Sequence, residues 1–190
     1  EVHLGADVRP ETLDLLADLT HLERLYVWGS TLDDQGLARL RPLAESRLNH
    51  QAWYVVRQMV SLLGEVGGAE SIPALEKAYV HDEPRVKKEV MKSLVRIGTH
   101  RATAFLLDKL GEQDHSLVSQ AIISLGMLKD PASIEPLAAI ASKRENFSDL
   151  IDPQKEAIKA LGIIGDTRAV AHLVKILSRK VWFGKKANDE

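Results

Sequence analysis

The ten residues from Leu161 to Val170 read Leu-Gly-Ile-Ile-Gly-Asp-Thr-Arg-Ala-Val. Weaker versions of this pattern begin at three earlier leucines, Leu63, Leu94 and Leu125, so that the four reference leucines lie 31, 31 and 36 residues apart. The residue eight positions after each leucine is small in every copy: Ser71, Ala102, Ser133 and Ala169. Self-similarity at such a period indicates one supersecondary unit that is copied in series.

Each copy predicts two helices joined by a short turn. Apolar residues three and four positions apart form one stripe before the reference leucine and another after the turn. The turn contains a residue that we expect in the left-handed conformation, glycine in three copies and lysine in one: Gly67, Gly98, Gly165 and Lys129. Asp130 and Asp166 follow as candidate N-caps of the second helix. A helix pair of this size cannot bury both stripes alone, so it must stack on neighbouring pairs.

The sequence of residues 161–170 resembles the HEAT-like repeats of the phycobilin-lyase type. Their pattern is a hydrophobic first helix, Leu-Gly-x-Ile-Gly-Asp, a variable residue, Arg-Ala-Val and a second helix. The resemblance covers about residues 51–180 and implies an all-α fold, a right-handed α-α superhelix in which helix pairs stack into an armadillo-like α-solenoid. It is specific for fold and not for function, because the family ranges from bilin attachment to plain protein scaffolding.

The repeat pattern also predicts how the chain is organised. Four repeats are expected at about residues 51–81, 82–112, 113–148 and 149–180, with an insertion at 143–153 that lengthens the third period. Residues 1–50 are less regular and predict either degenerate repeats or a helical cap, with helical spacing at 11–19 and again at Leu37, Leu40 and Leu43. Residues 181–190 are interpreted as a truncated linker, and the chain as a fragment of a longer bacterial-type protein.

Composition narrows the class of protein. Hydrophobic residues make up 45% and aromatic residues 5% of the sequence, a balance that favours helices packed through aliphatic side chains over a β-sandwich. The formal net charge of −2 gives no general attraction to nucleic acid or anionic membrane. No cysteine is present, which fits a cytoplasmic compartment, and no apolar run is long enough to span a bilayer. We therefore expect a monomeric fragment that does not contact a membrane.

A search for chemistry finds no motif for catalysis, metal binding or cofactor binding. HEAT-like hydroxylases hold a di-iron centre with His-Glu dipeptides, and none of the seven histidines here precedes a glutamate. The single substitute, His81-Asp82, lacks converging partners. No nucleophile elbow or Walker-type loop is present. We interpret the chain as non-enzymatic, without metal or cofactor, and nothing in it indicates a tetrapyrrole site.

The remaining hypothesis is a scaffold that binds another protein. By the family resemblance, second helices line the concave face of the array, so residues at outward positions on those helices are the candidate partner-binding residues. They are Lys77, His81, Arg101, Phe105, Asp108, Lys143, Arg168, His172, Lys175 and Arg179. Their mixed charges suit a protein partner better than nucleic acid. Two alternatives stay open: a nucleic-acid-binding repeat protein that uses the basic C-terminal end, and a regulatory or accessory segment of a larger enzyme.

Overall fold

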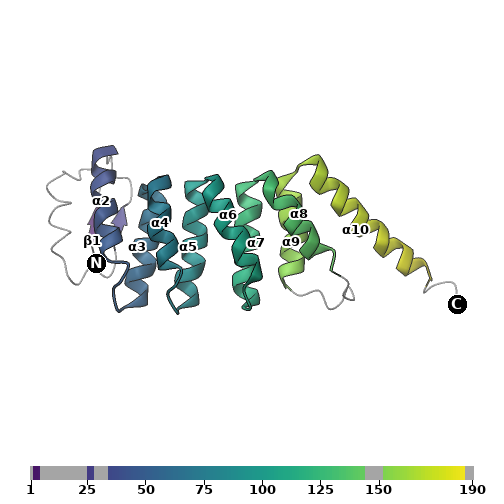
Figure 1. Cartoon of the computed structure of the whole chain (residues 1–190), viewed down its shortest axis with the longest axis horizontal. Helices are drawn as coiled ribbons and strands as arrows, with labels where there is room; N and C mark the ends of the chain where they lie inside the picture. Colours follow the sequence, from purple (N-terminus) through teal and green to yellow (C-terminus); the bar gives the residue numbers. More distant parts are fainter. Residues whose placement is uncertain (1, 5–24, 28–33, 144–151, 187–190) are drawn as a thin grey trace. The chain divides into compact units, whose positions relative to one another are not determined.

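The computed structural model describes residues 2–4, 25–27, 34–143 and 152–186, with side chains described in 40–143 and 152–178. The chain forms two compact units, residues 1–99 and 100–190, and each is described by itself below (Figure 1). The first unit contains five complete elements besides a short strand, and the second contains five α-helices within its described residues.

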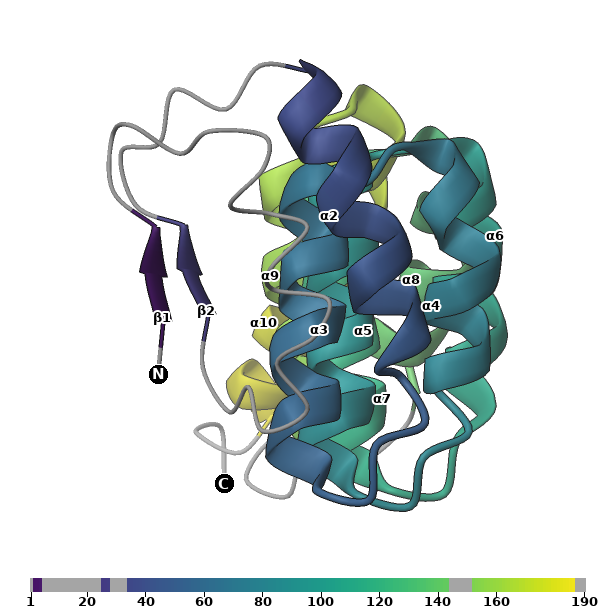
Figure 2. The ribbon, with the colours of Figure 1, turned by 90° about the vertical axis from the view of Figure 1, so that its left-hand side faces the viewer.

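In the first unit, four helices follow two very short strands. The strands β1 (Val2–Leu4) and β2 (Leu25–Val27) pair in parallel, with Val2 opposite Leu25 (Figure 2). The helices are α2 (Asp34–Ser46), α3 (Trp53–Val66), α4 (Ile72–Ala78) and α5 (Pro84–Ile97). Helix α3 packs against α2 on one side and α5 on the other, and α4 packs against both α3 and α5. First helices therefore stack on first helices, as the repeat pattern predicts.

The N-terminal region differs in part from its prediction. Helix α2 contains Leu40 and Leu43, both buried, so the helix predicted from the leucine spacing is present. The paired strands were not predicted, because three residues are too few to establish an alternating pattern. The helical spacing at 11–19 lies outside the described residues. Whether residues 1–50 are a cap or degenerate repeats remains a prediction.

The second unit continues the alternation of first and second helices. Its helices are α6 (His100–Asp108), α7 (His115–Leu128), α8 (Ile134–Ala141), α9 (Asp152–Ile164) and α10 (Thr167–Lys186). The first helices α7 and α9 lie side by side, α8 packs against α9, and α10 packs against α9 and α8 (Figure 1). The backbone of 181–186, predicted as a linker, belongs to α10, since no proline interrupts the helix there.

The core confirms the register of the repeats. All four reference leucines, Leu63, Leu94, Leu125 and Leu161, are completely buried. The small residue eight positions later is buried in each copy too, so the stripe that follows the turn faces inward. The described helices are packed through Leu, Ile, Val, Ala and Met, and the repeats are all-α, as predicted. Among the described helices, none is both long and apolar enough to cross a membrane.

The turns confirm three of the four predicted left-handed residues. Gly98 and Gly165 have φ angles of 68° and 69°, and Lys129 has a φ angle of 53°. Gly67 was predicted wrongly, because its φ angle of −91° and ψ angle of 148° are extended. A side chain is excluded at Gly67 for a different reason: a Cβ atom there would lie 2.3 Å from the Ser71 hydroxyl. This glycine meets a packing requirement and not a backbone one.

Candidate protein-binding face

The ten candidate residues, called here the second-helix face, are found mostly on the solvent side of their helices. Six are exposed: Lys77, Arg101, Asp108, Lys143, Arg168 and Lys175. Three are partly buried: His81, Phe105 and His172. The side chain of Arg179 lies outside the described residues. Two of the ten belong to the first unit and eight to the second, and the units are considered separately.

In the first unit, Lys77 and His81 have different surroundings. Lys77 is exposed in the last turn of α4, where its charge is favourable to the helix dipole. The Nδ1 atom of His81 accepts a hydrogen bond from the backbone N–H of Glu83, at 3.0 Å. Glu83 in turn caps α5, since its side chain accepts from the backbone N–H of Arg85. His81 therefore holds the turn between α4 and α5, and Lys77 is the better candidate for partner contact.

In the second unit, α6 presents an aromatic ring beside a charged pair. The ammonium group of Lys109 lies over the ring of Phe105, 4.8 Å from its centroid, and contacts the Asp108 carboxylate at 2.7 Å. The hydrogen bond from Lys109 lowers the pKa of Asp108 from its ordinary value, and the charge of Lys109 adds to this effect. Arg101 is exposed one turn before Phe105 on the same helix. The patch combines an amphipathic aromatic residue with both signs of charge, a composition common in protein interfaces.

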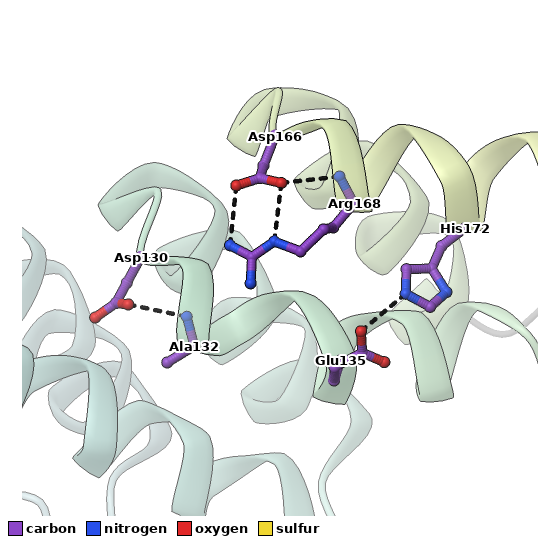
Figure 3. Close-up of polar contacts among 6 residues, drawn as sticks. All are labelled: Asp130, Ala132, Glu135, Asp166, Arg168 and His172. Carbon is purple, nitrogen blue, oxygen red and sulfur yellow. Dashed lines mark hydrogen bonds and ion pairs between the residues drawn. The ribbon is translucent and has the colours of Figure 1, made fainter.

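The next polar group lies where α10 begins (Figure 3). The Asp166 carboxylate accepts from the backbone N–H of Arg168 at 2.8 Å, which confirms the predicted N-cap. It also accepts two hydrogen bonds from the guanidinium group, from Nε at 3.1 Å and Nη2 at 3.0 Å. These hydrogen bonds lower the pKa of Asp166 and raise that of Arg168. Bidentate pairing fixes the guanidinium plane, so Arg168 is held in one orientation.

A second polar contact joins α8 to α10. The Nε2 atom of His172 lies 3.0 Å from a carboxylate oxygen of Glu135, as Figure 3 shows. The charge of Glu135 also contributes to the raised pKa of Arg168, after the larger effects of Asp166. Arg168, His172 and Glu135 therefore form one group across two adjacent second helices. This is the part of the second-helix face whose residues are brought together most clearly.

Sequence analysis missed Glu135, which lies ten residues after its reference leucine, whereas His172 lies eleven after the next. A search for complementary charges at these offsets in consecutive repeats could have found the pair. It also missed Lys109, although the spacing of four residues between Phe105 and Lys109 places them on one helix face. Both omissions arose because only positions equivalent in every repeat were compared.

The other candidates are less clearly grouped. Lys143 follows α8, and its carbonyl oxygen accepts from the buried amide of Gln154, at 3.5 Å. Most of the insertion at 143–153 lies outside the described residues, as do the side chains of Trp182 and Phe183. Trp53 is only partly buried: the Arg85 guanidinium lies over its ring, 4.9 Å from the centroid. Trp53 is therefore not a residue of the closed core.

No group of three or more His, Cys, Asp or Glu side chains that could hold a metal ion is found within the described parts of the chain. The grouped residues are a histidine, two arginines, carboxylates and a phenylalanine, most of them paired with one another at the surface. Such an arrangement can recognise a charged and partly apolar protein surface by complementary hydrogen bonds and ion pairs.

Comparison with known proteins agrees with the fold. The family model for HEAT repeats matches residues 40–126, and the model for the PBS lyase HEAT-like repeat matches residues 153–179. A curated relative, the phycocyanobilin lyase subunit alpha of a Picosynechococcus species, is 30% identical over 102 residues. That match includes 50% of this chain but only 38% of the relative, so the chain spans well under half of the relative's length. With the stacked helix pairs and buried reference leucines described above, these matches identify the chain as a HEAT-repeat protein.

Proposed function

We propose that this chain is a non-enzymatic scaffold that binds a partner protein through the second-helix face. HEAT repeats commonly mediate protein interactions, and such repeats are present here. The observation that carries the proposal is the group formed by Arg168, His172 and Glu135, which extends across two second helices and remains accessible to solvent. The absence of cysteine from the sequence supports a cytoplasmic setting.

The mixed charge of the face favours a protein over nucleic acid. Arg168 and His172 already have carboxylate partners, and Asp108 adds a negative charge on α6. A surface that follows a phosphate backbone would instead present unpaired cations in series. Complementary charges of both signs fix the register of a protein partner and select against wrong ones.

The test compares equivalent lysines on second and first helices. A photo-crosslinking amino acid is placed at Lys77 or Lys175 on second helices, and at Lys92 or Lys159 on first helices of the same units. After irradiation in lysate of the source organism with added nuclease, mass spectrometry identifies the attached proteins. The proposal predicts that one protein is attached from the second-helix positions and not from the matched first-helix positions.

Binding of the purified partner then gives the decisive measurement. Charge reversal of Lys77 or Lys175 to Glu is expected to weaken binding by about fivefold to tenfold, the effect of about 1 kcal/mol, whereas Lys92→Glu and Lys159→Glu leave it unchanged. Equal effects on both helix classes, or attachment that disappears with nuclease, would refute the proposal. The second result would favour a nucleic-acid-binding protein instead.

The relative's name raises one alternative, the attachment of a bilin. Its support is the partial match to a phycocyanobilin lyase subunit. Visible absorption of the chain after incubation with phycocyanobilin separates the two functions. The scaffold proposal predicts an unchanged bilin spectrum, and a saturable shift in the spectrum would favour the alternative.

A further inference from the structure

Helix α10 carries an exposed apolar stripe on the side that other second helices cover. Val170, Val174 and Leu177 lie at spacings of four and three residues and are 50%, 58% and 59% exposed. Residues at this spacing share one face of a helix. An apolar stripe of this kind on a helix indicates an interaction surface more strongly than single exposed residues do.

The preceding repeat shows what normally covers this stripe. The equivalent residues of α8, which precede those of α10 by 36 positions, are Ile134, Ala138 and Ala141. They are buried to 1%, 4% and 4% exposure, because α9 packs against α8. The face of α10 is therefore a helix-binding face of the repeat, present without the helix that covers it elsewhere in this unit.

The neighbouring first helix, α9, shows the same difference. In α7, a Cβ atom at Gly126 would lie 2.8 Å from Cβ of Ala160, so α9 approaches α7 closely there. The equivalent residue of α9 is Gly162, and a Cβ atom at that position would meet nothing within 4 Å. Ile163 adds no argument, because its equivalent in the covered repeat, Met127, is also exposed.

Charge indicates the kind of helix that fits. The sequence of α10 contains six Lys or Arg residues and no Asp or Glu. Lys175, which is exposed, lies between Val174 and Leu177. Two copies of such a helix would repel each other, whereas a helix with acidic residues beside its apolar stripe would be attracted. Because α10 stays helical to Lys186, the residues after Leu177 continue along its axis and do not turn back over the stripe.

We propose that Gly162, Val170, Val174 and Leu177 form a docking surface for an acidic amphipathic helix of a separate partner protein. The helix lies as α9 lies on α7 and α8, with a small residue against Gly162 and glutamate or aspartate beside Lys175. This surface is at the side of α10 and is distinct from the second-helix face, so the two proposals stand or fall separately.

The experiment uses the full chain and two stapled helical peptides as probes. Both carry an apolar stripe with an alanine at the position of closest approach; one has glutamate on both flanks and the other has lysine. A staple removes the cost of ordering the helix, so that a short probe can bind. Binding is measured by fluorescence anisotropy, with a DNA duplex of similar charge to the acidic peptide as a third probe.

The wild-type chain is expected to bind the acidic peptide saturably and at least about tenfold more tightly than the basic peptide. Val174→Lys distinguishes apolar docking from simple charge attraction, because it removes apolar surface while it adds a positive charge. We expect it to weaken binding at least about tenfold, whereas attraction by charge alone would strengthen binding. The matched control is Val80→Lys, since Val80 is an exposed valine in the first unit.

Gly162→Leu provides a second variant that leaves the fold intact, because the added side chain points into open space in the free protein. It is expected to weaken binding of the acidic peptide by a similar factor, since it blocks the close approach. The proposal is overturned if the acidic peptide does not bind, if Val174→Lys leaves its affinity unchanged or raises it, or if the DNA duplex binds more tightly. Dimerisation of the wild type that Val174→Lys abolishes would also overturn it, because the occupant would then be a second copy.

Discussion

A Cβ atom at Gly126 of α7 would lie 2.8 Å from the Cβ atom and 3.0 Å from the Cα atom of Ala160 in α9. The first unit repeats this relationship, because a Cβ atom at Gly64 of α3 would lie 2.6 Å from the Cβ atom of Ser93 in α5. In both units the residue after a reference leucine meets the residue before the next one. Glycine at this position therefore sets the distance between stacked first helices.

We predict that Gly126→Ala destabilises the second unit by about 1–3 kcal/mol, since the new methyl group must push apart two packed helices. The matched control is Gly162→Ala, at the equivalent position of α9, where a Cβ atom meets nothing within 4 Å. That substitution is expected to stabilise by up to about 1 kcal/mol, because alanine favours a helix more than glycine does. Urea unfolding followed by circular dichroism measures both. Two changes of the same sign would contradict the close contact of Gly126 with Ala160.

The left-handed residue Lys129 leads to a prediction of opposite sign. Its φ angle of 53° disfavours a residue with a Cβ atom, and the equivalent residues Gly98 and Gly165 are glycines at 68° and 69°. Lys129→Gly is expected to raise the free energy of unfolding by about 1 kcal/mol. As a control, Lys129→Ala keeps the Cβ atom and should give little gain. A larger gain from alanine than from glycine would show that the lysine charge and not the backbone is responsible.

The repeat, its two helices and its reference leucines could be predicted from sequence because each depends on local periodicity. The reason for a glycine could not always be predicted. Gly67 and Gly98 occupy equivalent positions, yet Gly67 is needed for the space beside Ser71 and Gly98 for its left-handed backbone. The pairing of Glu135 with His172 was also missed, since it depends on how far one second helix is shifted along the next. A linear pattern contains no information on that shift.

Buried Ser93 leads to a prediction that separates hydrogen bonding from packing. Its hydroxyl group donates to the carbonyl oxygen of Val60 at 2.8 Å, and its Cβ atom faces Gly64. Ser93→Ala keeps the shape and loses the hydrogen bond, which should cost about 1 kcal/mol. Ser93→Val adds a methyl group in the tight space beside Gly64 and is expected to cost about 1–3 kcal/mol more. Thermal unfolding compares the two variants. A valine variant as stable as the alanine variant would mean that α3 and α5 can separate without cost.

The Asp130 cap predicts a stability that depends on pH. The backbone hydrogen bond from Ala132, at 3.0 Å, is the main cause that lowers the pKa of this carboxyl group from 3.8. Since the folded pKa is the lower one, the contribution of the carboxylate is complete above 3.8 and is lost as the pH falls through the folded value. At neutral pH, Asp130→Ala is expected to cost about 1 kcal/mol, as the loss of an N-cap does. Asp130→Asn should cost less, because its amide oxygen can still accept from Ala132. Urea unfolding at a series of pH values should show the wild type and the alanine variant converging below pH 3.8. A difference that stays constant across this range would mean that the ionised carboxylate is not what stabilises the start of the second helix.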